Sequence, residues 1–169
     1  VGGAENGTLT FMVGGKDTAY KLMLPLFEAM GKKSVLCGQP GSGQAAKACN
    51  NMLLAITMIG VGEAFNLGSN LGLNPEKLFE VLSTSTSSCW AINTYCPIQG
   101  IGPKSPADNN FEPGFSGNLM LKDLTIALKA IKDTNTSAPF GTKSQENFKQ
   151  MIDDKKGELD FSAIVDFNK

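Results

Sequence analysis

Apolar positions follow a strand-like spacing near the start of the chain and a helical spacing after it. Residues 8–15, TLTFMVGG, are rich in β-branched and apolar residues and end at a glycine turn, which predicts a strand. Residues 34–38 predict a second short strand. Between them, residues 16–31 have apolar residues at helical spacing and end at a glycine. Pro25 inside this helical segment predicts a kink or an irregular turn.

A long helical pattern runs from about Ser42 to Gly72 without a strand signal inside it. Its segment MLLAITMIGVGEAF is apolar nearly all round, so we expect the helix to be buried on most of its sides. Gly60 and Gly62 weaken it locally, and close packing of a neighbouring backbone would explain both. The strongly apolar run near residues 52–62 is shorter than the ~18 residues that span a bilayer.

The rest of the chain predicts shorter helices. Asn74, Pro75 and Glu76 supply a cap, an N1 proline and a first-turn acid for a helix that reaches about Leu82. A long loop is expected over residues 97–117, helices over 116–133 and 139–156, and a short final turn capped from Asp160. The pattern therefore predicts a mainly α fold, with a short α/β part in residues 1–40 and an all-helical part in residues 41–169.

Composition narrows the chemistry. The 169 residues carry a net charge of −1, so no basic surface for nucleic acid or an acidic membrane is indicated. All basic residues are lysines, and the absence of histidine and arginine excludes a Ser-His-Asp triad, an imidazole base and a histidine metal site. The four cysteines form no C-x-x-C pair, so we interpret them as reduced core residues and expect no metal.

The glycine-rich segment before the long helix has two interpretations. Residues 41–46, GSGQAA, fit the G-x-G-x-x-A pattern of a dinucleotide-binding turn. Such a turn needs a second strand and an acid about 20 residues further on, but the acid at that distance, Glu63, lies inside the long helix. The alternative, which we favour, is that Gly41 and Gly43 only turn the chain and let the helix pack closely.

Polar residues beyond the glycines share one side of the long helix. At 100° per residue, Gly43, Lys47, Asn50 and Asn51 fall within about a third of its circumference. Lys47 either reaches solvent along an apolar stem or lines a polar cleft, and the two asparagines favour the cleft. Because desolvation shifts the pKa of lysine readily, such an amine can serve as an acid–base group.

At these residues the chain resembles the β-hydroxyacid dehydrogenases. Their signature G-x-x-G-x-G-x-x-x-K-x-x-x-N is matched in order by Gly38, Gly41, Gly43, Lys47 and Asn51. The segments GTLTFMVGG, SCWAINTYCP and GFSGNLMLKDLTIAL resemble the members that oxidise 3-hydroxyisobutyrate. The resemblance implies a cofactor, NAD. It also implies that this chain holds the last strands of the cofactor domain, the interdomain helix and the all-α C-terminal domain, whereas most of the N-terminal NAD-binding domain is absent.

The resemblance also assigns residue roles. Lys47 matches the catalytic lysine, which accepts the hydroxyl proton, while Asn51 and Gly43 match substrate-binding positions. Lys122 matches a lysine near the nicotinamide ribose. Asp123, the acid of the family's K-D motif, is assigned to substrate binding. Phe115 resembles a position that packs over the substrate. The structural alternatives are a solvated charge pair for Lys122 and Asp123 and a core position for Phe115, and for Trp90 the sequence indicates only a core position.

The sequence leaves several alternatives open. The resemblance favours NAD-dependent oxidation of 3-hydroxyisobutyrate in valine catabolism, by a homo-oligomer without nucleic acid or membrane partners. It places the protein in the mitochondrial matrix of a eukaryote or in the cytoplasm of a bacterium. The competing enzyme is a tartronate semialdehyde or glyoxylate reductase, and a non-catalytic helical oligomerisation module is the competing class. We expect the chain alone, without the missing domain, to be inactive.

Overall fold

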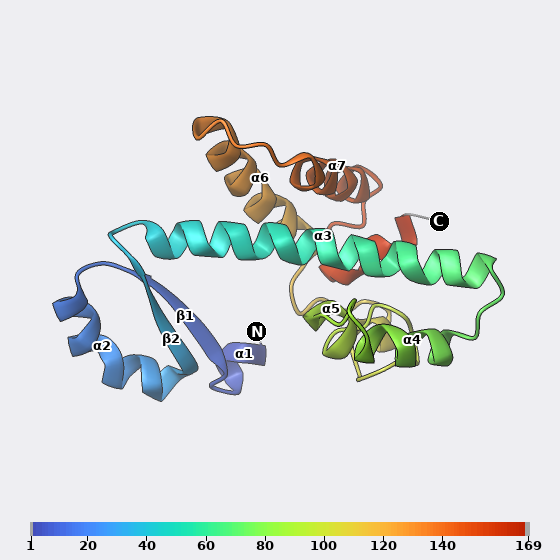
Figure 1. Cartoon of the computed structure of the whole chain (residues 1–169), viewed down its shortest axis with the longest axis horizontal. Coiled ribbons are helices and arrows are strands. Elements are labelled where there is room, and N and C mark those ends of the chain that lie inside the picture. The colour runs from blue at the N-terminus through green and yellow to red at the C-terminus, as the bar shows by residue number, and fades with distance from the viewer. Residues whose placement is uncertain (1, 168–169) are drawn as a thin grey trace. The chain divides into compact units, whose positions relative to one another are not determined.

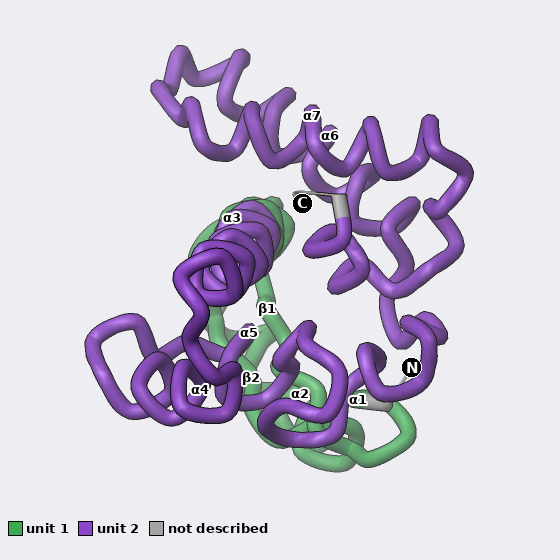
Figure 2. Tube along the Cα trace, turned by 90° about the vertical axis from the view of Figure 1, so that its right-hand side faces the viewer, with its two compact units in different colours: residues 1–51 green, residues 52–169 purple. Residues whose placement is uncertain are grey.

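The computed structural model describes residues 2–167, which divide into two compact units between Asn51 and Met52 (Figure 2). The boundary between the units falls inside the long helix, whereas the sequence pattern placed it before that helix, at residue 40. The mainly helical fold with a small α/β part, expected from the sequence, is confirmed (Figure 1).

The first unit is built around two parallel strands joined by a helix. A short helix, α1 (Gly2–Glu5), precedes β1 (Leu9–Gly14), α2 (Asp17–Met30) and β2 (Gly31–Gly38). Leu9 pairs with Gly31 at one end of the two strands and Gly14 with Gly38 at the other. The two strands and the helix between them were expected. β2 begins directly after α2 and is longer than expected, and α2 continues through Pro25.

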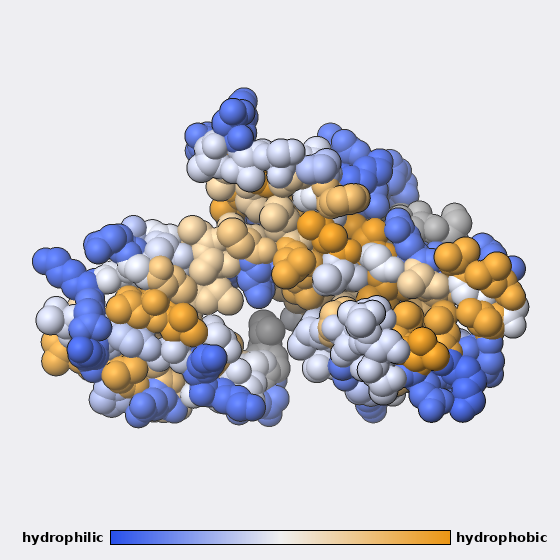
Figure 3. All heavy atoms as spheres, in the orientation of Figure 1, coloured by the Kyte–Doolittle hydropathy of each residue, from blue (hydrophilic) through white to orange (hydrophobic). Residues whose placement is uncertain are grey.

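Few side chains in the first unit are shielded from solvent. No residue of β1, α2 or β2 is fully buried, and Figure 3 shows apolar atoms at the surface of this part of the chain. Five large apolar side chains are exposed: Leu22, Met23, Leu26, Met30 and Val35. Leu22, with 81% of its surface exposed, is the extreme case. Local contacts, such as the Phe11 and Phe27 rings at 5.0 Å, therefore supply much of the packing in this unit.

The long helix α3 (Ser42–Asn70) spans both units with 29 residues. By length and composition alone it could cross a membrane, but Ala55, Met58 and Phe65 lie in the core of the second unit. The segment 52–65, expected to be buried on most of its sides, is buried or half-buried at most of its positions. Leu53 in this segment and Leu67 beyond it are nevertheless each 60% exposed. The apolar residues of α3 therefore divide between a core stripe and an uncovered stripe.

The second unit adds four α-helices and two 3-10 helices: α4 (Pro75–Thr84), α5 (Trp90–Asn93), η1 (Pro106–Asn109), α6 (Gly117–Asp133), α7 (Pro139–Asp153) and η2 (Phe161–Phe167). The Asn74 side chain accepts a hydrogen bond from the Lys77 N–H, and so caps α4 as expected. Fully buried Phe148, Met120 and Ile164 join α7, α6 and η2 to the buried side of α3.

The two glycines of α3 have different neighbours. A Cβ at Gly62 would lie 2.6 Å from Cγ1 and 3.1 Å from Cα of Val165, so the expected close approach of another segment is confirmed there. A Cβ at Gly60 meets nothing within 4 Å in the part of the chain that the structure describes. The packing explanation therefore holds for Gly62 alone within this chain.

Candidate functional site

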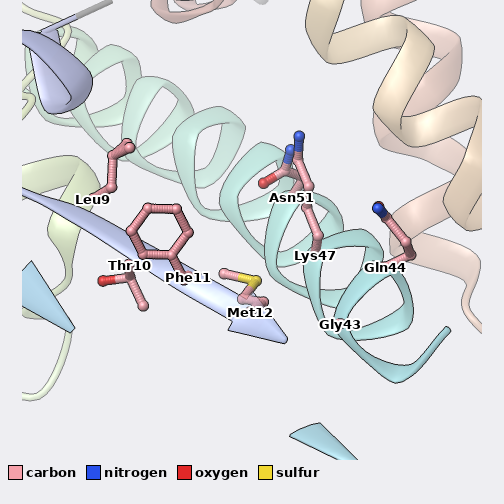
Figure 4. Close-up of a pocket in the computed structure, with 8 residues that line it drawn as sticks. All are labelled: Leu9, Thr10, Phe11, Met12, Gly43, Gln44, Lys47 and Asn51. Atoms are coloured by element: carbon pink, nitrogen blue, oxygen red, sulfur yellow. The ribbon is translucent and has the colours of Figure 1, made fainter. Parts of the chain in front are cut away.

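A cavity of about 410 Å³ in the first unit is lined by Gly43, Lys47 and Asn51 of the predicted polar helix face, but not by Asn50 (Figure 4). The residues that line it come from β1 and from the first turns of α3: Leu9, Thr10, Phe11, Met12, Gly43, Gln44, Lys47 and Asn51. β1 supplies a mostly apolar wall, and α3 supplies an amine and two amides. Such a mixture suits a small molecule with one apolar side and a few polar groups.

Lys47 and Asn51 lie one helical turn apart on the same side of α3, as Figure 4 shows. Lys47 is exposed, whereas Asn51 is 8% exposed and buried. The Asn50 side-chain amide donates to Oδ1 of Asn51 at 3.0 Å, which fixes the orientation of the Asn51 amide. The cleft favoured from the sequence is therefore present, with an exposed amine beside a fixed amide.

Gly43 is required by packing between α3 and β1. A Cβ at Gly43 would collide with the carbonyl oxygen of Met12, and it would lie 3.0 Å from the Gly14 nitrogen. Gly14 meets the same constraint from the other side, because its Cβ would lie 2.9 Å from the Ser42 nitrogen. This close approach brings the start of α3, and with it Lys47, against the end of β1. The substrate-binding role assigned to Gly43 stays a prediction.

The same contacts test whether residues 41–46 can hold a dinucleotide pyrophosphate. Such a turn must leave its backbone N–H groups open to the phosphates. Here the Ser42 N–H donates to the Gln39 carbonyl at 3.0 Å, and the end of β1 lies so close that a Cβ on Gly14 would be 3.0 Å from the Gly43 nitrogen. The turn does not fit a pyrophosphate: close packing accounts for Gly43, and a positive φ of 95° in the turn accounts for Gly41.

A second group of predicted residues lies in the second unit. The Lys122 amine, 59% exposed, pairs with Oδ1 of Asp123 at 3.1 Å, and the Asp123 side chain is only 7% exposed. Phe115 is half-buried just before α6 and packs edge-on against Phe161 at 5.8 Å. The exposed amine, held by a buried carboxylate, has the chemistry to donate to ribose hydroxyls. The role of Lys122 beside a nicotinamide ribose stays a prediction.

An aromatic and carboxylate cluster beside Phe115 had no signal in the sequence pattern. Trp90 stacks on Tyr95 at 4.7 Å, and Tyr95 stacks on Phe161 at 5.7 Å. The Tyr95 hydroxyl donates to Oδ2 of Asp160 at 2.9 Å. Trp90 is 47% exposed, so its interpretation as a core residue is wrong. Asp160, expected only to cap a final turn, is fully buried in this cluster.

The structure thus brings the predicted residues together in two sets, each inside its own unit. Gly43, Lys47 and Asn51 line the cavity of the first unit, and the second unit holds Phe115 with the Lys122–Asp123 pair. Over residues 2–167, no group of three or more Cys, Asp or Glu side chains could hold a metal ion. All four cysteines are free; Cys96 is buried, Cys37 and Cys89 are half-buried, and Cys49 is exposed, which contradicts a core position.

Comparison with known proteins gives these two sets a context. The family described as NAD-binding of NADP-dependent 3-hydroxyisobutyrate dehydrogenase matches residues 41–167, and the NAD-binding domain of 6-phosphogluconate dehydrogenase matches residues 1–38. A probable 3-hydroxyisobutyrate dehydrogenase of Mycobacterium tuberculosis is 45% identical over 98% of this chain and 56% of its own length. The mitochondrial 3-hydroxyisobutyrate dehydrogenase of Homo sapiens is 42% identical over 99% of this chain and 50% of its own length.

A solved structure agrees with these matches. The Mycobacterium tuberculosis 3-hydroxyisobutyrate dehydrogenase with L-serine superposes with a TM-score of 0.94 and 43% identity, over 99% of this chain and 57% of that one. The chain spans about half the length of the curated relatives it matches. Both family models describe nicotinamide-dinucleotide-binding regions, so NAD(P) is the cofactor class. The chain belongs to the 3-hydroxyisobutyrate dehydrogenase family.

Proposed function

We propose that a protein of the relatives' full length containing this chain oxidises 3-hydroxyisobutyrate to methylmalonate semialdehyde. A nicotinamide dinucleotide, when bound, would supply the hydride acceptor for this oxidation. Lys47 is assigned the role of the base that accepts the hydroxyl proton as the C–O bond becomes a carbonyl. The arrangement of Lys47 and Asn51 on the wall of one cavity, in a chain of this family, is the observation that carries the proposal.

Each residue of the first unit has a distinct task in this reaction. The exposed Lys47 amine reaches the substrate hydroxyl by rotating its side chain, and Asn51 holds the hydroxyl or the amine through its fixed amide. Gly43 brings the helix start against β1, so that Phe11 and Met12 can cover the apolar part of the substrate. In a chain without arginine, backbone donors and residues outside this chain must bind the substrate carboxylate.

The residues of the second unit bind rather than react. We assign Phe115 to packing against the substrate methyl group and Lys122 to a nicotinamide ribose hydroxyl. The buried Asp123 carboxylate pairs with the Lys122 amine at 3.1 Å, and we assign it to the substrate-binding side of the site. Phe115 is half-buried and Lys122 is exposed, so both can reach a ligand, whereas the buried Asp123 contacts Lys122.

Serine is a second substrate worth testing, because L-serine accompanies the Mycobacterium tuberculosis enzyme in its structure. Serine and 3-hydroxyisobutyrate share a primary alcohol on the carbon next to the carboxylate-bearing one. A role in valine catabolism follows if 3-hydroxyisobutyrate is preferred. A preference for tartronate semialdehyde or glyoxylate would support the competing reductase. Relatives from Drosophila melanogaster and Homo sapiens are named mitochondrial, and we propose the matrix for a eukaryotic source, and otherwise the cytoplasm.

The decisive experiment measures NAD and NADP reduction with 3-hydroxyisobutyrate, serine and glycerate in the full-length protein, with Lys47→Ala beside it. Loss of a general acid–base group lowers turnover ~10²- to 10⁴-fold. Lys33→Ala, which removes an exposed lysine from β2 outside the cavity, is the matched control and should retain wild-type turnover. Turnover of Lys47→Ala within a few-fold of wild type would remove this residue from the chemistry.

We propose further that the chain alone neither binds NAD with useful affinity nor oxidises a hydroxyacid. The packed turn at residues 41–46 offers no pyrophosphate site, and this supports the proposal. Isothermal titration of residues 1–169 with NAD should show no binding at micromolar concentration. A micromolar dissociation constant would restore the dinucleotide interpretation of that turn.

We propose that the exposed stripe of α3 is the interface of a homo-oligomer. Leu53, Gly60 and Leu67 recur every seven residues, and all three are exposed. A glycine between two leucines lets a second helix approach closely, and two copies of one stripe form a symmetric interface. Leu67→Glu should therefore convert a dimer or tetramer to a smaller species in sedimentation, whereas Leu22→Glu on α2 should leave the mass unchanged. An unaltered mass for Leu67→Glu would exclude this stripe.

A further inference from the structure

Asp160 is a fully buried carboxylate that accepts hydrogen bonds from five neutral donors. Its Oδ2 accepts from the Tyr95 hydroxyl at 2.9 Å and from the backbone N–H groups of Gly114 and Phe115 at 3.0 and 3.1 Å. Its Oδ1 accepts from the N–H and the hydroxyl of Ser162 at 3.0 and 2.7 Å. A buried carboxylate is tolerated when donors satisfy it in this way, and the donors are thereby fixed in place.

Backbone hydrogen bonds extend this contact in both directions. The Asp160 N–H donates to the Phe111 carbonyl at 2.8 Å, and the Phe161 N–H donates to the Phe115 carbonyl at 2.8 Å. The Gly117 N–H, in the first turn of α6, donates to the Leu159 carbonyl at 2.9 Å. The segment 159–161 therefore holds the loop 111–117 on both sides of Phe115. The Asp160 side chain adds its own hydrogen bonds to these backbone contacts.

Gly114 shows how closely the three segments meet. A Cβ on Gly114 would lie 2.9 Å from the Tyr95 hydroxyl oxygen and 3.6 Å from Oδ2 of Asp160. Burial, the charge of Asp160 and its hydrogen bond all raise the pKa of Tyr95, so the phenol stays protonated as the donor. The loop, the tyrosine and the carboxylate thus form one packed contact without space for rearrangement.

We infer that Asp160 is a positioning residue that holds Phe115 in place for substrate binding. The inference rests on the proposed function, which gives Phe115 its contact with the substrate. Asp160 acts through the Gly114 and Phe115 amides and through Phe161, whose ring packs edge-on against Phe115. Because Phe115 packs on the substrate without touching the transferred proton, Asp160 governs the KM of the hydroxyacid more than the turnover.

The test compares Asp160→Asn with Asp108→Asn. The Asp108 carboxylate also accepts two backbone N–H groups, from Gly100 at 2.7 Å and Ser105 at 2.9 Å, but it holds the loop around η1 and not the Phe115 loop. Asp160→Asn replaces one carboxylate oxygen by an NH₂ group, which cannot accept hydrogen bonds. This group would face either the donors of Tyr95 and the 114–115 backbone or those of Ser162. We expect amide exchange in residues 111–116 to accelerate about tenfold or more in Asp160→Asn, and not in Asp108→Asn.

In the full-length protein, Asp160→Asn should raise the KM for the hydroxyacid about tenfold or more and change kcat by less than about threefold. Asp108→Asn should leave that KM unchanged even if its melting temperature falls. If Asp160→Asn does not fold, Gly114→Ala displaces the same loop against Tyr95 and should raise the same KM. Unchanged exchange in residues 111–116, or faster exchange with an unchanged KM, would overturn the inference.

The exchange measurement also separates this inference from the proposed function. A wild-type protein that oxidises none of the hydroxyacids refutes the proposed function and, with it, the substrate part of this inference. Accelerated exchange in Asp160→Asn would then still show that the carboxylate holds the loop. An active wild-type enzyme with a normal Asp160→Asn KM refutes the inference alone.

Discussion

The two units of the chain differ in how they bury their apolar residues. In the second unit, Met58, Phe148 and Ile164 are completely buried, and helices from distant parts of the sequence contribute to one core. In the first unit, no residue of α2 or of the two strands is fully buried, and Leu22 and Leu26 are more than half exposed. Hydrophobic burial contributes about 25 cal/mol per Å², so it stabilises the second unit far more than the first.

The proposed chemistry sits in the less stable unit. Lys47 and Asn51 line a cavity whose other wall is β1, in a two-stranded sheet with little burial. An isolated pair of strands is marginal in water unless a helix covers it, and here the covering helix α2 has no buried residue. The site therefore depends on apolar surface of the first unit being covered by something beyond these residues, whereas the second unit supplies its own core. This contrast gives three tests.

The largest expected effect is in hydrogen exchange. Amides of β1, residues 9–14, should exchange on the order of 10³-fold faster than those of residues 52–66 in α3, because opening the weak unit costs several kcal/mol less. Mass spectrometry of peptides from residues 1–169 measures both segments in one experiment. α6 provides an internal control and should be protected like the middle of α3. Equal protection of β1 and α3 would show that the first unit is stable as it stands.

The second test applies one substitution to each unit. Phe148→Ala empties a fully buried site and should destabilise the second unit by about 3–5 kcal/mol. Phe11→Ala removes a half-buried ring that packs on Phe27 at 5.0 Å in the first unit. The fluorescence of Trp90, the chain's one tryptophan, reports the second unit during urea unfolding. Its midpoint should fall for Phe148→Ala and stay unchanged for Phe11→Ala.

A fall of the Trp90 midpoint in Phe11→Ala would contradict this expectation. It would mean that the two units unfold together, so that the difference in burial does not give them separate free energies of unfolding. A small effect of Phe148→Ala would instead mean that the core around α7 collapses to fill the space, which limits the cavity cost.

The sequence predicted features that arise from local patterns. The start of α3 follows from the glycine turn, and the Asn74 cap follows from its neighbours Pro75 and Glu76. The polar face of Lys47 and Asn51 follows from helical periodicity alone. These features need only residues within a turn or two of one another, so spacing in the sequence is enough to find them.

Features made by distant residues could not be predicted. α5 and η1 are too short for a periodic pattern, and the contact in which the Ser105 hydroxyl donates to the Cys96 carbonyl at 2.6 Å leaves no such pattern either. The Tyr95–Asp160 hydrogen bond joins residues 65 positions apart. No periodicity marks either residue. Trp90 was placed in the core on hydrophobicity alone, but nearly half of its surface is exposed, which a stacked position at the edge of a unit explains.

The smallest expected effect concerns the two tyrosines, one in each unit. Burial, followed by the charge and hydrogen bond of Asp160, raises the pKa of Tyr95 above its ordinary value of 10.0. Because the folded state favours the protonated phenol, this contribution to stability is fully present below pH 10 and is lost as the pH rises beyond it. The Tyr20→Phe variant leaves Tyr95 as the chain's only tyrosine, so absorbance at alkaline pH reports it alone.

Folded Tyr20→Phe protein should therefore form tyrosinate at a higher pH than the same protein in urea, and Asp160→Asn should narrow the difference by removing the negative charge. The difference should vanish if the second unit opens at that pH. Ionisation at the same pH in both states, while Trp90 fluorescence still reports a folded second unit, would mean that the Tyr95–Asp160 contact is loose in solution. In that case the second unit would be tightly packed around Phe148 but not around Tyr95. The two units would then differ in their buried cores, but the outer part of the second unit would be as loosely packed as the first unit.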